Sequence, residues 1–169
     1  MNETISTTQF MKDWQRQRSD LLWWFKIPDH SRPMAAANIS GKRAVDVIAC
    51  YNGLLIGMEW KLKKDKRAIP CRRVRINQIE TLCNIEVAGG LGLLMIMVYL
   101  GPRDKAVYAI PIAEWNKQTQ LIYEKSNRKS IRIEEIFPQY KMLQHQIGQY
   151  KHWDITLLKE FINNAKNRK

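Results

Sequence analysis

Asp46, Glu59 and Lys61 are the charged residues of the stretch 44–61, which is otherwise largely apolar. Carboxylate oxygens are the ligands that Mg²⁺ prefers, and a lysine beside such a site can orient or deprotonate a water molecule. The three residues therefore predict a divalent-metal site that activates water. The alternative is that Lys61 simply offsets the two acids, or that all three face solvent. The apolar surroundings and the basic segment that follows favour the metal site.

A β-hairpin is expected to bring these side chains together. Asn52-Gly53 is the strongest short signal for a two-residue type I′ turn, because that turn needs positive φ at both central positions. Asp46 lies six residues before Asn52 and Glu59 six residues after Gly53, so the two carboxylates should be near cross-strand neighbours. Glu59 and Lys61 are two residues apart and therefore point to the same face of their strand.

A strongly basic segment runs from Lys61 to Arg75, with eight basic residues and one acid, Asp65. Because it begins at the proposed catalytic lysine and ends where a helix is predicted, it would frame the site, and we expect it to contact phosphates. A solvated surface loop is the alternative. A second loop, at 29–42, leads into the hairpin and brings further basic residues. The predicted DNA contacts are Arg32, Lys42, Arg43, Lys63, Lys64, Lys66, Arg67, Arg72, Arg73 and Arg75.

A helix is predicted directly after the basic segment. Asn77 and Glu80 have the spacing of a capping box, with Asn77 as the N-cap, and Gly89-Gly90 supply the stop. Gln78 then lies in the first turn, where the positive end of the helix dipole suits a phosphate. The alternative for Gln78 is an exposed helix residue.

The order of these motifs resembles the PD-(D/E)xK nuclease superfamily. Asp46 is followed after twelve residues by Glu59-Trp60-Lys61 and then by a helix bearing Gln78, a layout most similar to Holliday-junction resolvases of the RecU type. The similar part covers about 41–100. Val45 occupies the position of the proline that gives the superfamily the P of its name.

The resemblance implies a role for each motif residue. Asp46 and Glu59 would be metal ligands together with the backbone carbonyl of Trp60, Lys61 would be the catalytic lysine, and Gln78 would be an active-site accessory. Such families often carry a further acid on the first helix. The candidates in this chain are Glu3, Asp13 and Asp20.

The predicted elements give a single α/β domain over 1–169, with a mixed β-sheet flanked by helices as in restriction-endonuclease-like cores. Apolar residues at helical spacing predict an N-terminal helix over about 4–26. The catalytic core is expected over about 41–112, with a buried central strand at 92–99. A helical extension is expected over about 138–166, of which 138–153 is ambiguous.

Charge and cysteine content narrow the class of protein. The 169 residues include 28 Lys+Arg and 16 Asp+Glu, which gives a formal net charge of +12. This charge favours nucleic acid as the first candidate partner and an anionic membrane surface as the second. Three cysteines without C-x-x-C spacing argue against a zinc knuckle or a disulfide framework. No signal peptide is visible, so a soluble, cytoplasmic protein is expected.

The leading interpretation is a Mg²⁺- or Mn²⁺-dependent endonuclease that hydrolyses phosphodiester bonds of DNA. The resemblance implies junction DNA as substrate, a role in recombination or repair, and a homodimer, because two strands must be cut symmetrically. One alternative is a catalytically inactive DNA-binding module on a nuclease scaffold. Another is a nuclease for flaps, replication forks or DNA ends.

Overall fold

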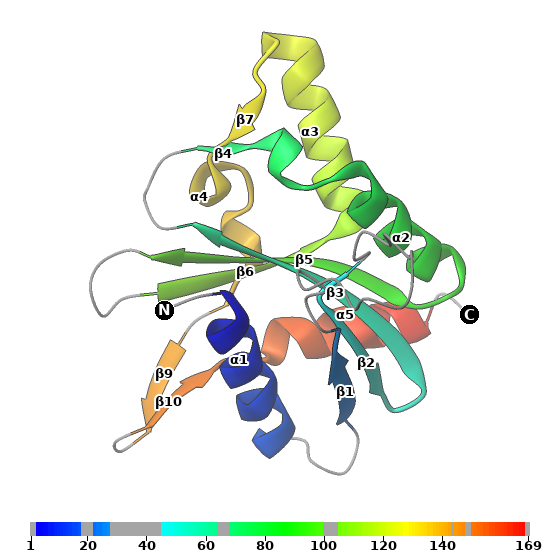
Figure 1. Cartoon of the computed structure of the whole chain (residues 1–169), viewed down its shortest axis with the longest axis vertical. Helices are drawn as coiled ribbons and strands as arrows, with labels where there is room; N and C mark the ends of the chain where they lie inside the picture. The colour runs from blue at the N-terminus through cyan, green and yellow to red at the C-terminus, as the bar shows by residue number, and fades with distance from the viewer. Residues whose placement is uncertain are drawn as a thin grey trace, which may run out of the picture.

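A six-stranded mixed sheet with the order β1-β2-β3-β5-β6-β8 forms the centre of the molecule (Figure 1). The computed structural model describes residues 3–17, 22–27, 45–63, 68–99, 105–142, 144–147 and 150–167. In the sheet, β3 and β5 form the parallel pair and the other neighbours run antiparallel. The single-domain α/β fold with a mixed sheet is therefore confirmed. The elements are α1 (Glu3–Gln17), β1 (Leu22–Lys26), β2 (Val47–Tyr51), β3 (Leu54–Lys63), β4 (Ile69–Pro70), η1 (Cys71–Arg73), α2 (Ile76–Val87), β5 (Leu91–Tyr99), β6 (Lys105–Pro111), α3 (Ile112–Ser126), β7 (Ser130–Ile131), α4 (Ile133–Ile136), η2 (Pro138–Tyr140), β8 (Lys141–Met142), β9 (Gln144–Ile147), β10 (Tyr150–Trp153) and α5 (Thr156–Lys166).

The hairpin between β2 and β3 has the predicted turn and register. Asn52 has a φ of 47° and Gly53 a φ of 79°, as a type I′ turn requires. The strands pair from Tyr51 opposite Leu54 to Val47 opposite Met58. This register decides which residues of β3 point to each side of the sheet, and the site depends on it.

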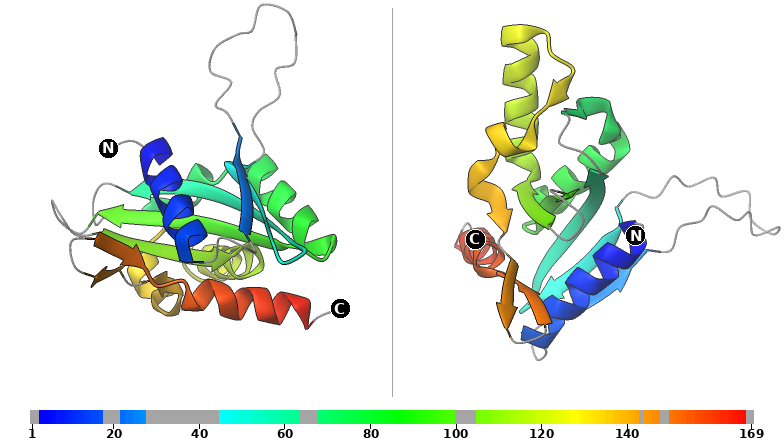
Figure 2. Two further views of the ribbon diagram at one scale, coloured as in Figure 1. Left: turned by 90° about the horizontal axis from the view of Figure 1, so that it is seen from below. Right: turned by 90° about the vertical axis from the view of Figure 1, so that its left-hand side faces the viewer.

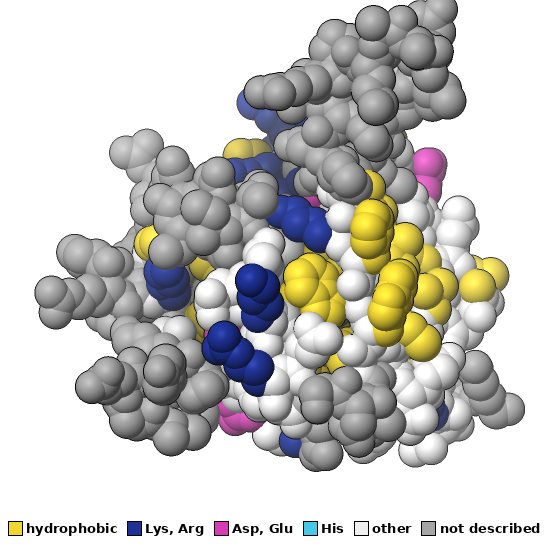
Figure 3. Space-filling view, turned by 60° about the horizontal axis from the view of Figure 1, so that its bottom comes forward, with side chains coloured by type: hydrophobic (Ala, Val, Ile, Leu, Met, Phe, Trp, Pro, Cys, Tyr) yellow, Lys and Arg dark blue, Asp and Glu magenta, His cyan; other side chains and the backbone are white. Residues whose placement is uncertain are grey.

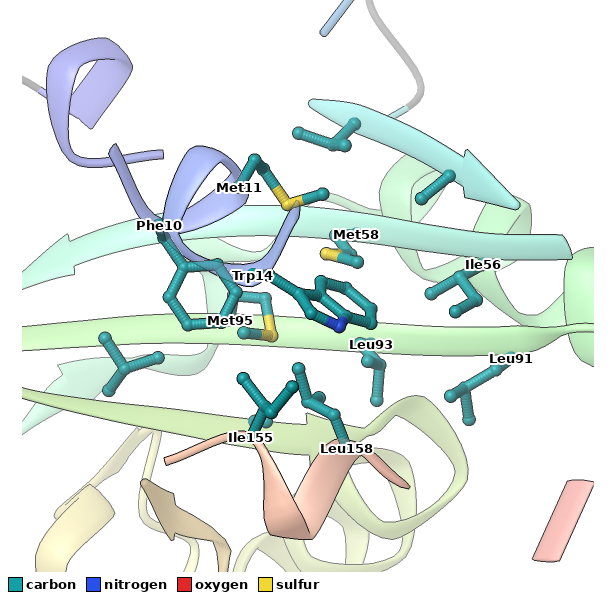
Figure 4. Close-up of a cluster of buried hydrophobic side chains, with 14 of the residues drawn as sticks. Phe10, Met11, Trp14, Ile56, Met58, Leu91, Leu93, Met95, Ile155 and Leu158 are labelled. Carbon is teal, nitrogen blue, oxygen red and sulfur yellow. The ribbon is translucent and has the colours of Figure 1, made fainter. Parts of the chain in front are cut away.

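Two layers of helices cover the sheet (Figure 2). On one side, α1 and α5 pack over a cluster that includes Phe10, Trp14 and Met58 (Figure 4). On the other side, α2, α3 and α4 cover a second cluster that includes Leu82 and Trp115. The central strand β5 is buried along nearly its whole length, as its continuous apolar sequence predicted.

The predicted N-terminal helix over 4–26 is wrong in its second half. Helix α1 ends at Gln17, and Leu22–Lys26 forms β1, which pairs antiparallel with β2. Exposure alternates along this strand, with Leu22 buried and Trp23 and Phe25 exposed. Aromatic residues fit a pleated, half-buried surface well, and pairing with β2 outweighs the helical spacing of the apolar residues.

The expected helical extension over 138–166 is also only partly correct. Lys141–Met142 adds β8 to the sheet beside β6, and β9 pairs with β10 in a separate two-stranded sheet. The helix of this region is α5, over Thr156–Lys166. Pairing with the open edge of β6 is a tertiary contact that local periodicity does not reveal. Among the helices that the structure describes, none has the length and apolar content to cross a membrane.

Candidate active site

Asp46 and Glu59 lie opposite each other where β2 begins. The pairing of Val47 with Met58 places Asp46 beside Glu59 at the next position, and the Asp46 backbone N–H donates to the Met58 carbonyl at 3.0 Å. Both residues are buried, with 2% and 1% of their surface exposed. The predicted juxtaposition of the two carboxylates is thus present. Two buried carboxylates at neighbouring positions are costly unless positive charge or donors compensate them.

Lys61 and Gln78 both donate to one oxygen of Glu59. The Lys61 Nζ lies 2.6 Å from Glu59 Oε1, and the Gln78 Nε2 lies 2.5 Å from the same atom. Lys61 Nζ also donates to Gln78 Oε1 at 3.2 Å, which closes a triangle of three side chains. The lysine is therefore held between a carboxylate and an amide, and its rotational freedom is restricted.

Gln78 is fixed in turn by the start of α2. Its Oε1 accepts a hydrogen bond from the backbone N–H of Arg75, the N-cap, at 3.0 Å. The helix begins at Ile76, so Gln78 stands at N3 and plays the part that the sequence assigned to Glu80. The predicted N-cap at Asn77 is wrong by two residues because Arg75 takes the extended backbone conformation of a cap. One amide thus caps the helix and contacts the Glu59 carboxylate.

Trp60 connects the two carboxylate-bearing segments through its backbone. Its N–H donates to Asp46 Oδ2 at 2.7 Å, which holds the aspartate against β3. Its side chain points to the other face of the sheet and packs against Phe10 of α1, with ring centroids 5.1 Å apart. The alternation of β3 therefore separates a charged face, with Glu59 and Lys61, from an apolar one.

The basic segment divides into surface and structural residues. Arg72, Arg73 and Arg75 are exposed, and Arg73 Nη2 donates to the Leu62 carbonyl at 2.6 Å. The prediction that Lys63 contacts DNA has to be corrected. Lys63 is buried, and its Nζ lies 2.9 Å and 3.1 Å from the two carboxylate oxygens of Glu134. It therefore holds α4 against β3 in this structure and does not present a surface cation. The other predicted contacts, Arg32, Lys42, Arg43, Lys64, Lys66 and Arg67, lie outside the described residues.

The environment of Glu134 also affects β6. Burial raises the pKa of Tyr108 above its usual value, and the nearby negative charge of Glu134 adds to the rise. Glu134 of α4 thus lies close to both Lys63 of β3 and Tyr108 of β6.

The family model of Recombination protein U, RecU, matches residues 22–157. The chain belongs to the RecU family. RecU is a family of Holliday-junction resolvases. The matched region includes β1, the hairpin and α2, and so contains all four residues of the site.

Two further comparisons accompany the RecU match. The solved structure of Hjc from Archaeoglobus fulgidus, a Holliday junction resolvase from an archaeal hyperthermophile, is similar at 16% identity and a TM-score of 0.42. The alignment covers 78% of this chain and 92% of that chain. No curated protein matches the chain.

The donor set of this RecU chain suits a hard divalent cation. Asp46 and Glu59 supply carboxylate oxygens, and the Trp60 carbonyl lies next to Glu59 in the chain. Among the residues that the structure describes, no group of three or more His, Cys, Asp or Glu side chains forms a metal site. Of the acids considered as a further ligand, Asp13 is buried and accepts from Gln9 at 3.0 Å and Arg16 at 3.4 Å within α1. Neither the Glu3 side chain nor Asp20 is described.

Proposed function

We propose that this RecU-family chain is a Mg²⁺- or Mn²⁺-dependent endonuclease that cuts branched DNA, with Holliday junctions as its preferred substrate. The observation that carries the proposal is the triangle of Glu59, Lys61 and Gln78 beside the buried Asp46. A structural ion pair needs neither a second buried carboxylate nor an amide fixed by a helix cap. A nuclease site needs carboxylates to hold a cation and an ordered lysine at the phosphate.

Each residue has a distinct part in the proposed hydrolysis. Asp46 and Glu59, with the Trp60 carbonyl, would hold the cation. The bound cation would lower the pKa of a water ligand and neutralise charge developing on the phosphate. Lys61 would orient the attacking water and stabilise the negative charge. Gln78 would keep the Lys61 ammonium in place. The water oxygen bonds to phosphorus, the bond to the leaving oxygen breaks, and that oxygen ends protonated.

Resolution of a four-way junction requires two symmetric cuts, so we propose a two-fold homodimer. A surface suited to a second copy lies on β1 and the β2–β3 hairpin. In the sheet, Trp23 pairs with Cys50 and Cys50 with Leu55, so their side chains share one face. Trp23 is 60% exposed, Phe25 51% and Leu55 42%. We name this surface of Trp23, Phe25, Cys50 and Leu55 the apolar patch.

The charge of the chain supports a second copy as the occupant of the apolar patch. Two copies that each carry a formal +12 repel one another, and this repulsion is smallest when they meet through surfaces that lack basic residues. Figure 3 shows hydrophobic side chains gathered on one side of a face whose Lys and Arg side chains lie mostly on the other. An uncharged apolar surface is complementary to itself, as a two-fold interface requires. DNA would instead follow the basic side.

A cleavage panel tests the proposed function. The full chain is incubated with a four-way junction, a flap, a replication fork, linear duplex and single-stranded DNA, in Mg²⁺, in Mn²⁺ and in EDTA. We expect paired symmetric nicks in the junction with either cation and none in EDTA. Binding of the junction without cleavage would indicate an inactive DNA-binding module, and preferential cutting of flaps, forks or ends would assign another substrate.

A further inference from the structure

The turn between α3 and β7 forms a second basic surface, distant in sequence from the segment 61–75. It follows the C-terminal end of α3, where Asn127 takes the left-handed conformation with a φ of 50°. Among the described ion pairs, none involves Arg128 or Lys129, and both side chains are exposed. The exposed basic residues of this surface, which we call the α3–β7 turn, are Lys125, Arg128, Lys129 and Arg132.

Backbone hydrogen bonds attach the α3–β7 turn to the segment that precedes α2. Strand β7 pairs with β4, with Ile131 opposite Ile69 and Ser130 opposite Pro70. The Cys71 backbone N–H donates to the Lys129 carbonyl at 2.9 Å. Figure 1 shows β4 and β7 meeting at the end of the molecule from which α3 projects. The turn is therefore held in a fixed position next to Arg72 and Arg73.

The same region is connected to the catalytic strand. Arg73 donates to the Leu62 carbonyl at 2.6 Å, and Lys63 pairs with Glu134 of α4, the helix that follows β7. Glu59, Lys61 and Lys63 are alternate residues of β3 and point to one face of the sheet. At a rise of about 3.3 Å per residue, Lys63 lies about 13 Å from Glu59 along the strand. A DNA backbone that passes the carboxylates and continues over the exposed side chains of Arg72 and Arg73 would approach the α3–β7 turn.

A hollow of about 700 Å³ opens beside the α3–β7 turn. The residues that line it include Ser126, Arg128, Ser130, Arg132 and Glu135, together with apolar residues such as Ile122 and Ile131. Arg132 Nη1 donates to Glu135 Oε1 at 2.8 Å, so that acid is already engaged. Ser126 Oγ already donates to the Ile122 carbonyl at 2.8 Å. Arg128 lies outside the described ion pairs and is a suitable donor for a phosphate.

We propose that the α3–β7 turn is a second binding site for the DNA backbone, in which Arg128 and Lys129 contact phosphates of the duplex arm that leaves the catalytic carboxylates past Arg72 and Arg73. The inference rests on the proposed function, because it assigns the path of the same DNA substrate. The site reads no bases: exposed cations neutralise phosphates and release counterions. Because pairing of β7 with β4 already fixes the backbone, little backbone conformational entropy is lost on binding.

The slope of log K against log salt measures how many phosphates the turn neutralises. The variant Arg128→Gln/Lys129→Gln keeps the polar side chains, and the Lys129 carbonyl still accepts from Cys71. With a four-way junction in EDTA, we expect its slope to fall by up to about 1.8, at about 0.9 for each duplex phosphate that the variant no longer neutralises. The charge reversal Arg128→Glu/Lys129→Glu should weaken binding further. Circular dichroism should show unchanged melting for the first variant.

The matched control removes two positive charges from the opposite layer. Lys12→Gln/Lys166→Gln changes α1 and α5, which cover the other side of the sheet, and should leave the slope within error of the parent. An unaltered slope in Arg128→Gln/Lys129→Gln, or an equal fall in the control, would overturn this inference. If the parent chain cuts junctions and the salt slope of Arg128→Gln/Lys129→Gln equals that of the parent, the result would refute this site and leave the proposed function standing. A parent chain that fails to bind DNA would refute the proposed function.

Discussion

Gln78 at the start of α2 donates to the Glu59 carboxylate of β3 at 2.5 Å, while its carbonyl oxygen accepts from the Arg75 backbone. One side chain thus joins the helix cap to the proposed metal ligand and to Lys61. The geometry of the site therefore depends on where α2 begins, and a change at Gln78 should affect both catalysis and the helix end.

We predict that Gln78→Ala lowers the rate of cleavage by about 10- to 100-fold, with a smaller effect on DNA affinity. Lys61 loses the amide that orients it, and this electrostatic group acts mainly in the transition state. Removal of the capping hydrogen bond should reduce the free energy of unfolding by about 1 kcal/mol. Single-turnover cleavage and urea unfolding measure the two effects. Glu80→Ala, at an exposed position of the same helix, serves as control, and equal cleavage by both variants would contradict the proposed role.

Glu59→Ala and Asp46→Ala should each abolish cleavage in Mg²⁺ and leave junction binding intact or slightly tighter, because a negative charge near the phosphate is removed. Lys61→Ala should slow cleavage by about 10²-fold or more, as expected for a preorganised electrostatic group. Single-turnover assays measure the rates, and gel shifts in EDTA measure binding. Near-parental cleavage by either carboxylate variant would show that the cation is held elsewhere.

Much of the site could be predicted from the sequence because a two-residue turn fixes the register. Once Asn52-Gly53 forms the type I′ turn, the opposition of Asp46 and Glu59 follows from counting residues. The cap at Arg75 could not be predicted in the same way, because Gln78 Oε1 binds its N–H while Gln78 Nε2 contacts Glu59, a residue of another element. Strand β1 was missed because its pairing with β2 is also a long-range contact, whereas its apolar residues fit helical spacing locally.

Lys63 shows why a run of basic residues does not specify function residue by residue. Its side chain is 3% exposed and that of Glu134 is 32% exposed. We predict that Lys63→Ala reduces the free energy of unfolding by about 1–2 kcal/mol, because the buried lysine is lost from the pair while the half-buried acid keeps part of its solvation. The salt slope of DNA binding should be unchanged. Urea unfolding and binding titrations measure the two quantities.

The opposite pattern is expected at the exposed arginines of the same segment. Arg72→Gln/Arg75→Gln should lower the salt slope by up to about 1.8 and weaken binding to all DNA sequences alike, while stability barely changes. Weakened folding with an unaltered slope would show that these arginines are structural. DNA would then approach by another face.

The apolar patch predicts how the chain associates. By the usual contact area of aromatic side chains, Trp23 and Phe25 expose roughly 200–250 Å² together, enough for the centre of an interface but not for its full area of about 800 Å² on each partner. Trp23→Glu places a charge opposite its own copy across the two-fold axis and should convert a dimer to monomers, with Kd raised by about 100-fold or more. Sedimentation equilibrium measures this change.

Tyr123→Glu provides the comparison, because Tyr123 is a similarly exposed aromatic residue on α3, away from the apolar patch. It should leave the oligomeric state unchanged. The monomeric Trp23→Glu variant should also release single nicks in place of paired cuts, because one site then acts on each junction at a time. A parent chain that is monomeric at micromolar concentration, or a Trp23→Glu variant that still dimerises, would move the interface away from β1.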